Sequence, residues 1–354
     1  MSRPVRAALV SVSSTELTST EKSLLEKYNP LGVSLFNRNI ATPQQLQKLI
    51  ADIKETLGRE DALIAVDQEG GRVRRLREPD FRAYAGQQTL GRLYTEVSPA
   101  AAQKAVKIQA ALIAADLHSL GINLNYAPVL DVRSPQTAPV LSSRIFSDTP
   151  QIVAELGKIM ADEYMAQNII PCIKHLPGHG RAAVDPHLHL PVITAALPEL
   201  ENDFYPFKQL HRLPCGMTAH IVVAAVDDNA PVTQSPKAVR ELIRGQIGFD
   251  GFLISDAIDM RALKGSLSEK TITALNAGCD AVCYCAGEVC RAARPLTDDA
   301  LERLPRMTAV LSAPKHEHNI TALQEEYIQI LGQIEAYDET YDATEVLFKM
   351  QQPN

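Results

Sequence analysis

The chain has 354 residues, of which 45% are hydrophobic and 22% are charged, so its composition is that of an ordinary globular protein and not of a disordered chain. Its 35 Lys and Arg residues stand against 42 Asp and Glu, and the formal net charge of -7 argues against a nucleic-acid partner. The sequence contains no stretch close to the roughly 18 uncharged apolar residues of a transmembrane helix. Because Arg6 also interrupts the short apolar run at the start, we expect a cytoplasmic protein that does not bind a membrane.

Short apolar runs rich in β-branched residues recur along the chain and alternate with segments of helical pattern. Eight of these runs have the length of a strand, and in chain order they are 5–11, 32–36, 62–67, 122–128, 169–175, 215–220, 251–256 and 280–285. Strands that alternate with helices form parallel sheets, and eight such strands can close into a barrel. The sequence therefore predicts an α/β fold, a TIM-type (β/α)8 barrel.

Several intervening segments begin with residues that favour the start of a helix. Thr42 is followed by Pro43 and Gln45, and the pair Ser235–Pro236 repeats the combination of a capping hydroxyl and a proline in the first turn. Apolar residues follow both starts at helical spacing, at Leu46, Ile50 and Ile53 and at Val239, Leu242, Ile243 and Ile247.

The chain beyond residue 286 has helical pattern only, which includes the segment 323–334. The sequence shows no internal repeat and no low-complexity linker that would separate a second domain. We therefore expect a single domain, with the barrel in residues 1–290 and a helical C-terminal extension in residues 291–354 that packs on the barrel.

Ionisable residues stand at the ends of four predicted strands. Asp67 ends the third strand, Lys174 and His175 end the fifth, His220 ends the sixth and Asp256 ends the seventh. A single polar residue at such a place would only mark where a strand leaves the core. In a barrel of this type, however, the carboxyl ends of the strands meet at one rim, where active sites lie. We therefore expect a shared functional site.

The segment from Lys174 to Pro191 contains four histidines and one aspartate. The spacing of Asp185 and His187 lets a carboxylate orient an imidazole and support its protonated form, which is typical of an acid/base pair. Asp256 at its strand end is the best candidate for a carboxylate nucleophile. Asp259 lies nearby, but its position suggests the opening of a following helix.

A divalent metal site is the alternative interpretation of the histidines. Neither an H-x-H pattern on the first strand nor an HExxH helix is present, so the spacing matches no metal motif, yet spacing alone does not exclude a metal. The ligands of such a site would come from His175, His179, His187, His189, His220 and Asp256. The six cysteines are bunched unfavourably for disulfides, and we expect reduced thiols.

Taken together, these motifs resemble the single-domain β-N-acetylhexosaminidases of glycoside hydrolase family 3, which act in bacterial peptidoglycan recycling. The resemblance covers nearly the whole chain. Its carriers are VDQEGGRV at 66–73, NYAPVLDV at 125–132, IKHLPGHG at 173–180, DPH at 185–187, MTAHI at 217–221 and ISDAIDM at 254–260.

The resemblance implies a retaining exo-β-N-acetylglucosaminidase in which Asp256 is the nucleophile, His187 the acid/base and Asp185 its dyad partner. It also implies peptidoglycan fragments that carry N-acetylglucosamine as substrates, and no cofactor or metal. The oligomeric state is not implied, and we favour a monomer. A carbohydrate-binding protein without turnover is the remaining alternative. The sugar-binding residues that the resemblance implies are Asp67, Arg75, Arg144, Lys174 and His175.

Overall fold

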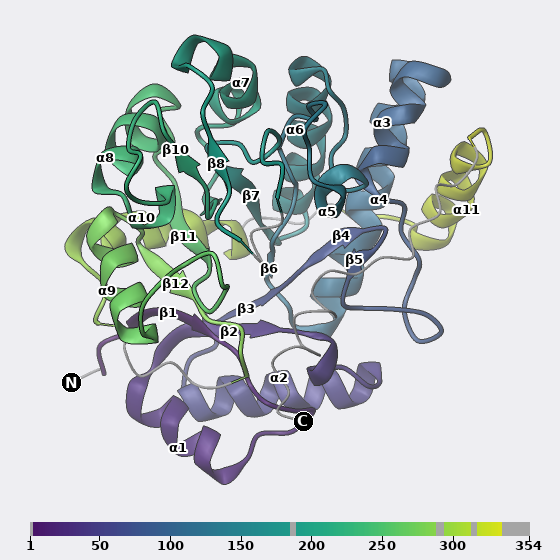
Figure 1. Ribbon diagram of the computed structural model, residues 1–354. Helices are drawn as coiled ribbons and strands as arrows, with labels where there is room; N and C mark the ends of the chain where they lie inside the picture. The colour runs from purple at the N-terminus through teal and green to yellow at the C-terminus, as the bar shows by residue number, and fades with distance from the viewer. Residues whose placement is uncertain (1–2, 185–188, 288–293, 313–316, 335–354) are drawn as a thin grey trace, which may run out of the picture.

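A closed barrel of eight parallel strands forms the centre of the molecule (Figure 1). The computed structural model describes residues 3–184, 189–287, 294–312 and 317–334, and the description below is confined to these. Around the barrel the strands follow one another in the order β1, β12, β11, β9, β7, β6, β3 and β2. The bounds are β1 Arg6–Val10, β2 Pro30–Leu35, β3 Leu63–Val66, β6 Leu124–Asn125, β7 Ile170–Leu176, β9 Cys215–Thr218, β11 Phe252–Ala257 and β12 Ala281–Cys283.

Each of the eight predicted runs contributes one strand of this barrel, so the predicted (β/α)8 fold is confirmed. The fourth run was predicted too long, because only two of its residues are in β6. Asparagine side chains make the neighbouring contacts instead: Asn125 accepts the Gln68 N–H and donates to the Gln68 carbonyl, each at 3.0 Å. Asn123 likewise accepts the Ile64 N–H at 2.8 Å. Side-chain hydrogen bonds thus extend the pairing of β3 with β6.

Helices surround the barrel (Figure 1), and the two helix starts predicted from capping residues, at Thr42 and Ser235, are confirmed. Thr42 accepts the Gln45 N–H at 3.2 Å, and Ser235 accepts the Ala238 N–H at 3.0 Å. The bounds are α1 Ser19–Tyr28, α2 Pro43–Leu57, α3 Gln87–Glu96, α4 Pro99–Leu120, α5 Pro139–Ser142, α6 Pro150–Ala166, α7 Glu201–Gln209, α8 Pro236–Ala238, the π-helical η4 Val239–Gln246, α9 Leu267–Ala277, α10 Asp298–Thr308 and α11 Ile320–Leu331. Short 3-10 turns are η1 Asn37–Asn39, η2 Leu197–Leu200, η3 Val232–Gln234 and η5 Ala309–Ser312.

Two small sheets stand outside the barrel. An antiparallel hairpin of β4 (Gln68–Gly70) and β5 (Val73–Arg74) follows β3 directly, and we call residues 68–74 the β4–β5 hairpin. The long interval before the fourth barrel strand therefore holds this hairpin in addition to α3 and α4. The second sheet pairs β8 (Val192–Ile193) with β10 (Val222–Val223) in parallel.

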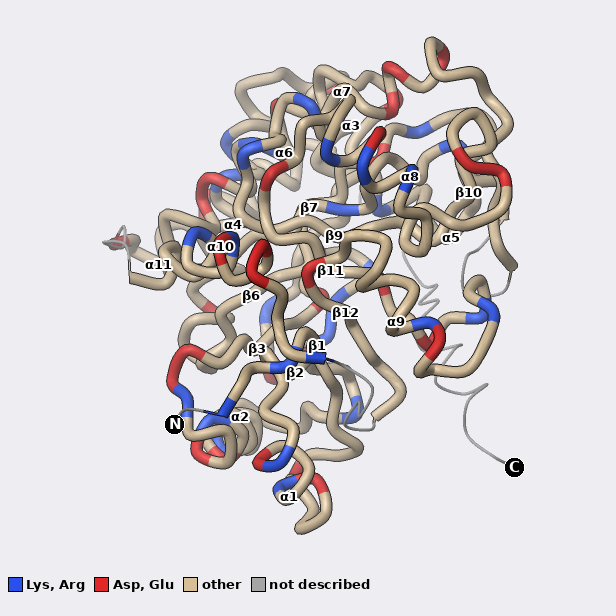
Figure 2. Tube along the Cα trace, turned by 90° about the vertical axis from the view of Figure 1, so that its left-hand side faces the viewer, with Lys and Arg blue, Asp and Glu red and all other residues tan. Residues whose placement is uncertain are grey.

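Beyond residue 294 the described part of the chain is mainly helical, as predicted, and its last helix, α11, packs against α4 in both views (Figures 1 and 2). Acidic and basic residues are interspersed over the outer helices (Figure 2). Among the residues described, no helix combines the length and the apolar character that crossing a bilayer requires.

Candidate active site

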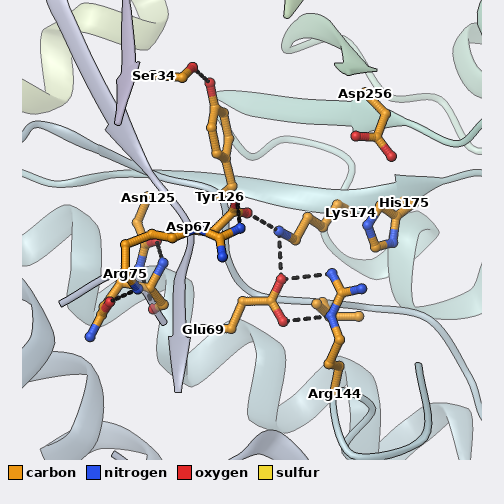
Figure 3. A network of polar contacts seen from close by, with 12 residues as sticks. Ser34, Asp67, Glu69, Arg75, Asn125, Tyr126, Arg144, Lys174, His175 and Asp256 are labelled. Atoms are coloured by element: carbon orange, nitrogen blue, oxygen red, sulfur yellow. Dashed lines mark hydrogen bonds and ion pairs between the residues drawn. The ribbon is translucent and has the colours of Figure 1, made fainter. Parts of the chain in front are cut away.

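A buried lysine is the centre of the site. Lys174 lies on β7, and its side chain is only 2% exposed. Its Nζ lies 2.8 Å from Asp67 Oδ1 and 2.6 Å from Glu69 Oε1 (Figure 3). Burial alone would lower the pKa of Lys174, but the charges of the two carboxylates outweigh burial and raise it. The ammonium group therefore stays charged and joins β7 to the segment that follows β3.

Glu69 forms a second link, to Arg144, which follows α5. The Arg144 Nε and Nη2 atoms each lie 2.8 Å from one oxygen of the Glu69 carboxylate, a bidentate geometry (Figure 3). Burial would raise the pKa of Glu69, but the charges of Arg144 and Lys174 bring it below its ordinary value. Glu69 is therefore an ionised carboxylate that bridges two cations inside the protein.

Asp67 is the more accessible carboxylate of the pair. Its Oδ2 accepts a hydrogen bond from Arg75 Nη2 at 3.0 Å, and its side chain is 20% exposed. Burial would raise its pKa, but Lys174 and Arg75 together hold it far below the usual range. Gln68 positions Arg75 by accepting its backbone N–H at 3.0 Å. An ionised, partly exposed carboxylate held in this way can accept hydrogen bonds from two hydroxyl groups of a ligand.

Asp131 positions two histidines, His175 near the end of β7 and His179 in the loop that follows. Its Oδ2 lies 2.7 Å from His175 Nδ1, and its Oδ1 accepts the backbone N–H groups of His175 at 3.3 Å and of His179 at 2.6 Å. The rings of the two histidines meet edge to face, with centroids 5.7 Å apart. Burial lowers the pKa of His179 to about 4, so this imidazole is neutral at pH 7. The His175 ring lies beside Lys174 (Figure 3).

Asp256 lies near the end of β11, and its carboxylate points toward the space beside Lys174 and His175 (Figure 3). Its Oδ1 accepts the Ala257 N–H at 2.7 Å. His220 holds the same stretch of backbone, because its Nε2 donates to the Ala257 carbonyl at 2.9 Å. The carboxylate is therefore half-buried on a rigid strand, which suits a group that must approach a bound substrate in a fixed direction.

The structure brings six of the eight predicted site residues together at the carboxyl ends of β3, β7 and β11. These six are Asp67, Arg75, Arg144, Lys174, His175 and Asp256. The predicted dyad, Asp185 and His187, lies outside the described residues.

Glu69 and Asp131 are functional residues that the sequence patterns did not predict. Glu69 lies two residues after a strand-ending aspartate, and Asp131 ends the apolar run that follows β6, so the strand-end rule could have found both. The interpretation of Asp259 was wrong, because no helix begins there. Its carboxylate accepts the Cys285 N–H at 2.9 Å, and α9 begins only after its own cap, Ser266.

Two of the histidines considered as metal ligands have other partners. His175 Nδ1 contacts Asp131, and His220 contacts both Thr233 and the Ala257 carbonyl. Within the described residues, no group of three or more His, Cys, Asp or Glu side chains is arranged to hold a metal ion. The five cysteines in the described segments are free thiols, and Cys283 and Cys285 have their sulfurs 3.6 Å apart.

A closed parallel barrel with carboxylates and cations gathered at the carboxyl ends of its strands defines a class, the (β/α)8-barrel enzymes. Residues 6–314 match the glycosyl hydrolase family 3 N terminal domain, and the chain belongs to this family. It is therefore a glycosidase.

Similar proteins agree with this assignment. A β-hexosaminidase of Bordetella avium is 36% identical over 307 residues, which cover 85% of this chain and 85% of the relative. A β-hexosaminidase of Alkalilimnicola ehrlichii is 36% identical over 282 residues, which cover 78% of this chain and 80% of the relative. A similar solved structure is the crystal structure of NagZ from Neisseria gonorrhoeae in complex with N-trifluoroacetyl-D-glucosamine. The two chains superpose with a TM-score of 0.80 at 29% sequence identity. The superposition covers 93% of this chain and 98% of the NagZ chain.

Proposed function

We propose that the protein is a retaining exo-β-N-acetylglucosaminidase that removes terminal N-acetylglucosamine from peptidoglycan fragments in the cytoplasm. The observation that carries this proposal is the position of Asp256, at the end of β11 and facing the ion-pair network of Lys174, Asp67 and Glu69 (Figure 3). A double displacement requires a carboxylate nucleophile beside a site that fixes the sugar.

The proposed nucleophile, Asp256, has the support that nucleophilic attack needs. Its strand position limits movement, and the hydrogen bond from the Ala257 N–H fixes the direction of the carboxylate. The ionised carboxylate attacks the anomeric carbon, the bond to the leaving oxygen breaks, and a glycosyl-enzyme ester forms. Water then displaces Asp256 and restores the β-configuration.

Five residues are proposed to hold the hydroxyl and acetamido groups of the terminal sugar: Asp67, Arg75, Arg144, Lys174 and His175. Hydroxyls need both acceptors and donors, and the network offers an ionised carboxylate, Asp67, next to a charged ammonium, Lys174. The bidentate contact between Glu69 and Arg144 fixes these groups in place before a sugar binds.

His187, supported by Asp185, is the proposed acid/base. Along the chain, the dyad comes shortly after His179, whose N–H donates to Asp131. In the first step His187 protonates the leaving oxygen, and in the second it accepts a proton from water. No metal or cofactor takes part in this proposal.

The names of the relatives support the substrate. Similar proteins are called β-hexosaminidases, and the similar Neisseria structure contains an N-acylated glucosamine.

Hydrolysis of 4-nitrophenyl N-acetyl-β-glucosaminide tests the proposal, with the corresponding β-glucoside as the matched substrate and with and without EDTA. We expect activity that is selective for the acetamido sugar, insensitive to EDTA and absent in Asp256→Asn, with the β-anomer as first product in proton NMR. His187→Ala should lose more activity toward poor leaving groups than toward good ones, because only poor ones need protonation.

Three results would overturn parts of the proposal. Activity lost to EDTA would favour a metal site among the histidines. A first product of α-configuration would refute a double displacement. If neither substrate is hydrolysed but the sugar still binds, the result would favour a carbohydrate-binding protein.

A further inference from the structure

We propose that Tyr327, on the C-terminal helix α11, is a positioning residue for the sugar site, acting through Gln109 and Ala85 on the β4–β5 hairpin that carries Glu69. The inference rests on the proposed function, because its readout is the binding of the sugar. The family match ends at residue 314, before α11 begins at Ile320, so α11 lies outside the matched domain.

Tyr327 reaches from α11 into the interior, where it is only 4% exposed. Its hydroxyl donates to Gln109 Oε1 on α4 and accepts the Ala85 N–H at 3.1 Å. Gln109 Nε2 in turn donates to the Ala85 carbonyl at 3.1 Å. The N–H and the carbonyl of Ala85 are therefore both held by this pair of side chains, and removal of the tyrosine hydroxyl would leave a partly buried N–H without that partner.

Ala85 is in direct contact with the turn of the β4–β5 hairpin. A Cβ atom on Gly70 would overlap the Ala85 carbonyl oxygen and would lie 2.9 Å from Gln109 Nε2. Gly70 has a φ of +97°, so both its conformation and its space require glycine. The next residue, Gly71, donates its N–H to the Tyr84 carbonyl at 2.8 Å. Residues 84 and 85 thus form the support on which the hairpin turn rests.

A second contact joins α11 to the same support. Gln324, one helical turn before Tyr327, accepts a hydrogen bond from Arg82 Nε at 3.3 Å. Arg82 and Tyr84 both contact the Asp116 carboxylate on α4. Both contacts from α11 therefore reach the segment 82–85, and α11 lies along the outer side of α4 in both views (Figures 1 and 2).

The position of the hairpin determines the position of Glu69, which directly precedes Gly70. Glu69 bridges Lys174 at 2.6 Å and Arg144 at 2.8 Å, so a small shift of the hairpin displaces two proposed sugar-binding cations. In the barrel order, β3 and β11 are on opposite sides, so Asp256 stands on a strand across the barrel from the one that leads into the hairpin. Loss of the Tyr327 hydroxyl should therefore weaken sugar binding and leave the chemical step largely intact.

The experiment compares Tyr327→Phe with Tyr94→Phe in the full chain. Tyr94 is a matched control, because its hydroxyl bonds Glu155 at 2.9 Å between α3 and α6, away from the segment 82–85. For Tyr327→Phe we expect KM for 4-nitrophenyl N-acetyl-β-glucosaminide and Ki for free N-acetylglucosamine to rise together by about three- to tenfold, as for one lost hydrogen bond, with kcat within about twofold. Tyr94→Phe should leave all three constants unchanged.

The Glu69→Gln background tests the route of the effect. If Tyr327 acts through Glu69, Tyr327→Phe should raise Ki much less in that background than in the wild type. An unchanged KM with a lower Tm would show a merely structural role, and an equal rise of Ki in both backgrounds would refute the route. Wild-type protein that cleaves no N-acetylglucosaminide would refute the proposed function and this inference with it, whereas active wild type with an unaffected Tyr327→Phe would refute the inference alone.

Discussion

Replacement of Glu69 by glutamine removes one charge from the ion-pair network and keeps the side-chain volume. Glu69 is 1% exposed and contacts Lys174 at 2.6 Å and Arg144 at 2.8 Å. Both oxygens of Glu69 accept hydrogen bonds from Lys174 and Arg144. In glutamine an NH2 group replaces one of these oxygens. Because NH2 is a donor and cannot accept, a cation that pointed to that oxygen loses its acceptor there. A buried cation without a partner is costly.

The size of the effect follows from burial. Loss of one partner of a buried ion pair costs about 3–5 kcal/mol, and we expect about 3 kcal/mol because Asp67 still pairs with Lys174. For a large domain this lowers Tm by roughly 6–12 °C. We also expect kcat/KM to fall by at least about tenfold, because Lys174 loses one of its two carboxylate partners and Arg144 loses its ionised bidentate partner.

The pH dependence carries a specific sign. The pKa of Glu69 is below its ordinary value of 4.5, so its contribution to stability is present above that value and is lost as the pH falls toward the folded-state pKa. The difference in Tm between wild type and Glu69→Gln should therefore be largest near pH 7 and shrink below about pH 4.5.

Thermal unfolding at a series of pH values, together with initial rates on 4-nitrophenyl N-acetyl-β-glucosaminide, measures both effects. Glu96→Gln is the matched control, because Glu96 pairs with Arg92 at 2.8 Å on the surface with a 48% exposed side chain, and it should change Tm little. Equal changes in the two variants, or a Tm difference for Glu69→Gln that grows at low pH, would refute the reasoning.

Three further outcomes are expected. Asp131→Asn should lower kcat/KM by about tenfold or more, since it weakens the contact that orients His175, and steady-state rates with an unfolding control measure this. The free energy of unfolding should fall as the pH drops from about 6.5 to 4, because burial lowers the pKa of His179 to about 4 and the unfolded chain therefore binds the proton first. In His179→Gln the free energy of unfolding should depend less on pH over this range. An unchanged pH dependence in that variant would contradict the prediction. Gly180→Ala should cost about 1–3 kcal/mol in denaturant unfolding, because the new Cβ overlaps the Val132 carbonyl, and a neutral result would show that the backbone can move.

Local sequence patterns determined the barrel and part of the site. Strand runs and helix caps depend on neighbouring residues, so all eight strands and the starts at Thr42 and Ser235 could be predicted. The strand-end rule placed Asp67, Lys174 and Asp256 at one rim, because a parallel barrel brings all carboxyl ends together.

Only the tertiary structure decided which charges pair. Glu69 meets an arginine 75 residues further along the chain, and Asp131 meets His175 after 44 residues, separations over which no spacing rule operates. Tyr327 reaches Gln109 across 218 residues. These contacts depend on the packing of whole helices and strands against one another, so the sequence by itself determined the elements and the rim, and the three-dimensional packing determined the network that makes the rim a site.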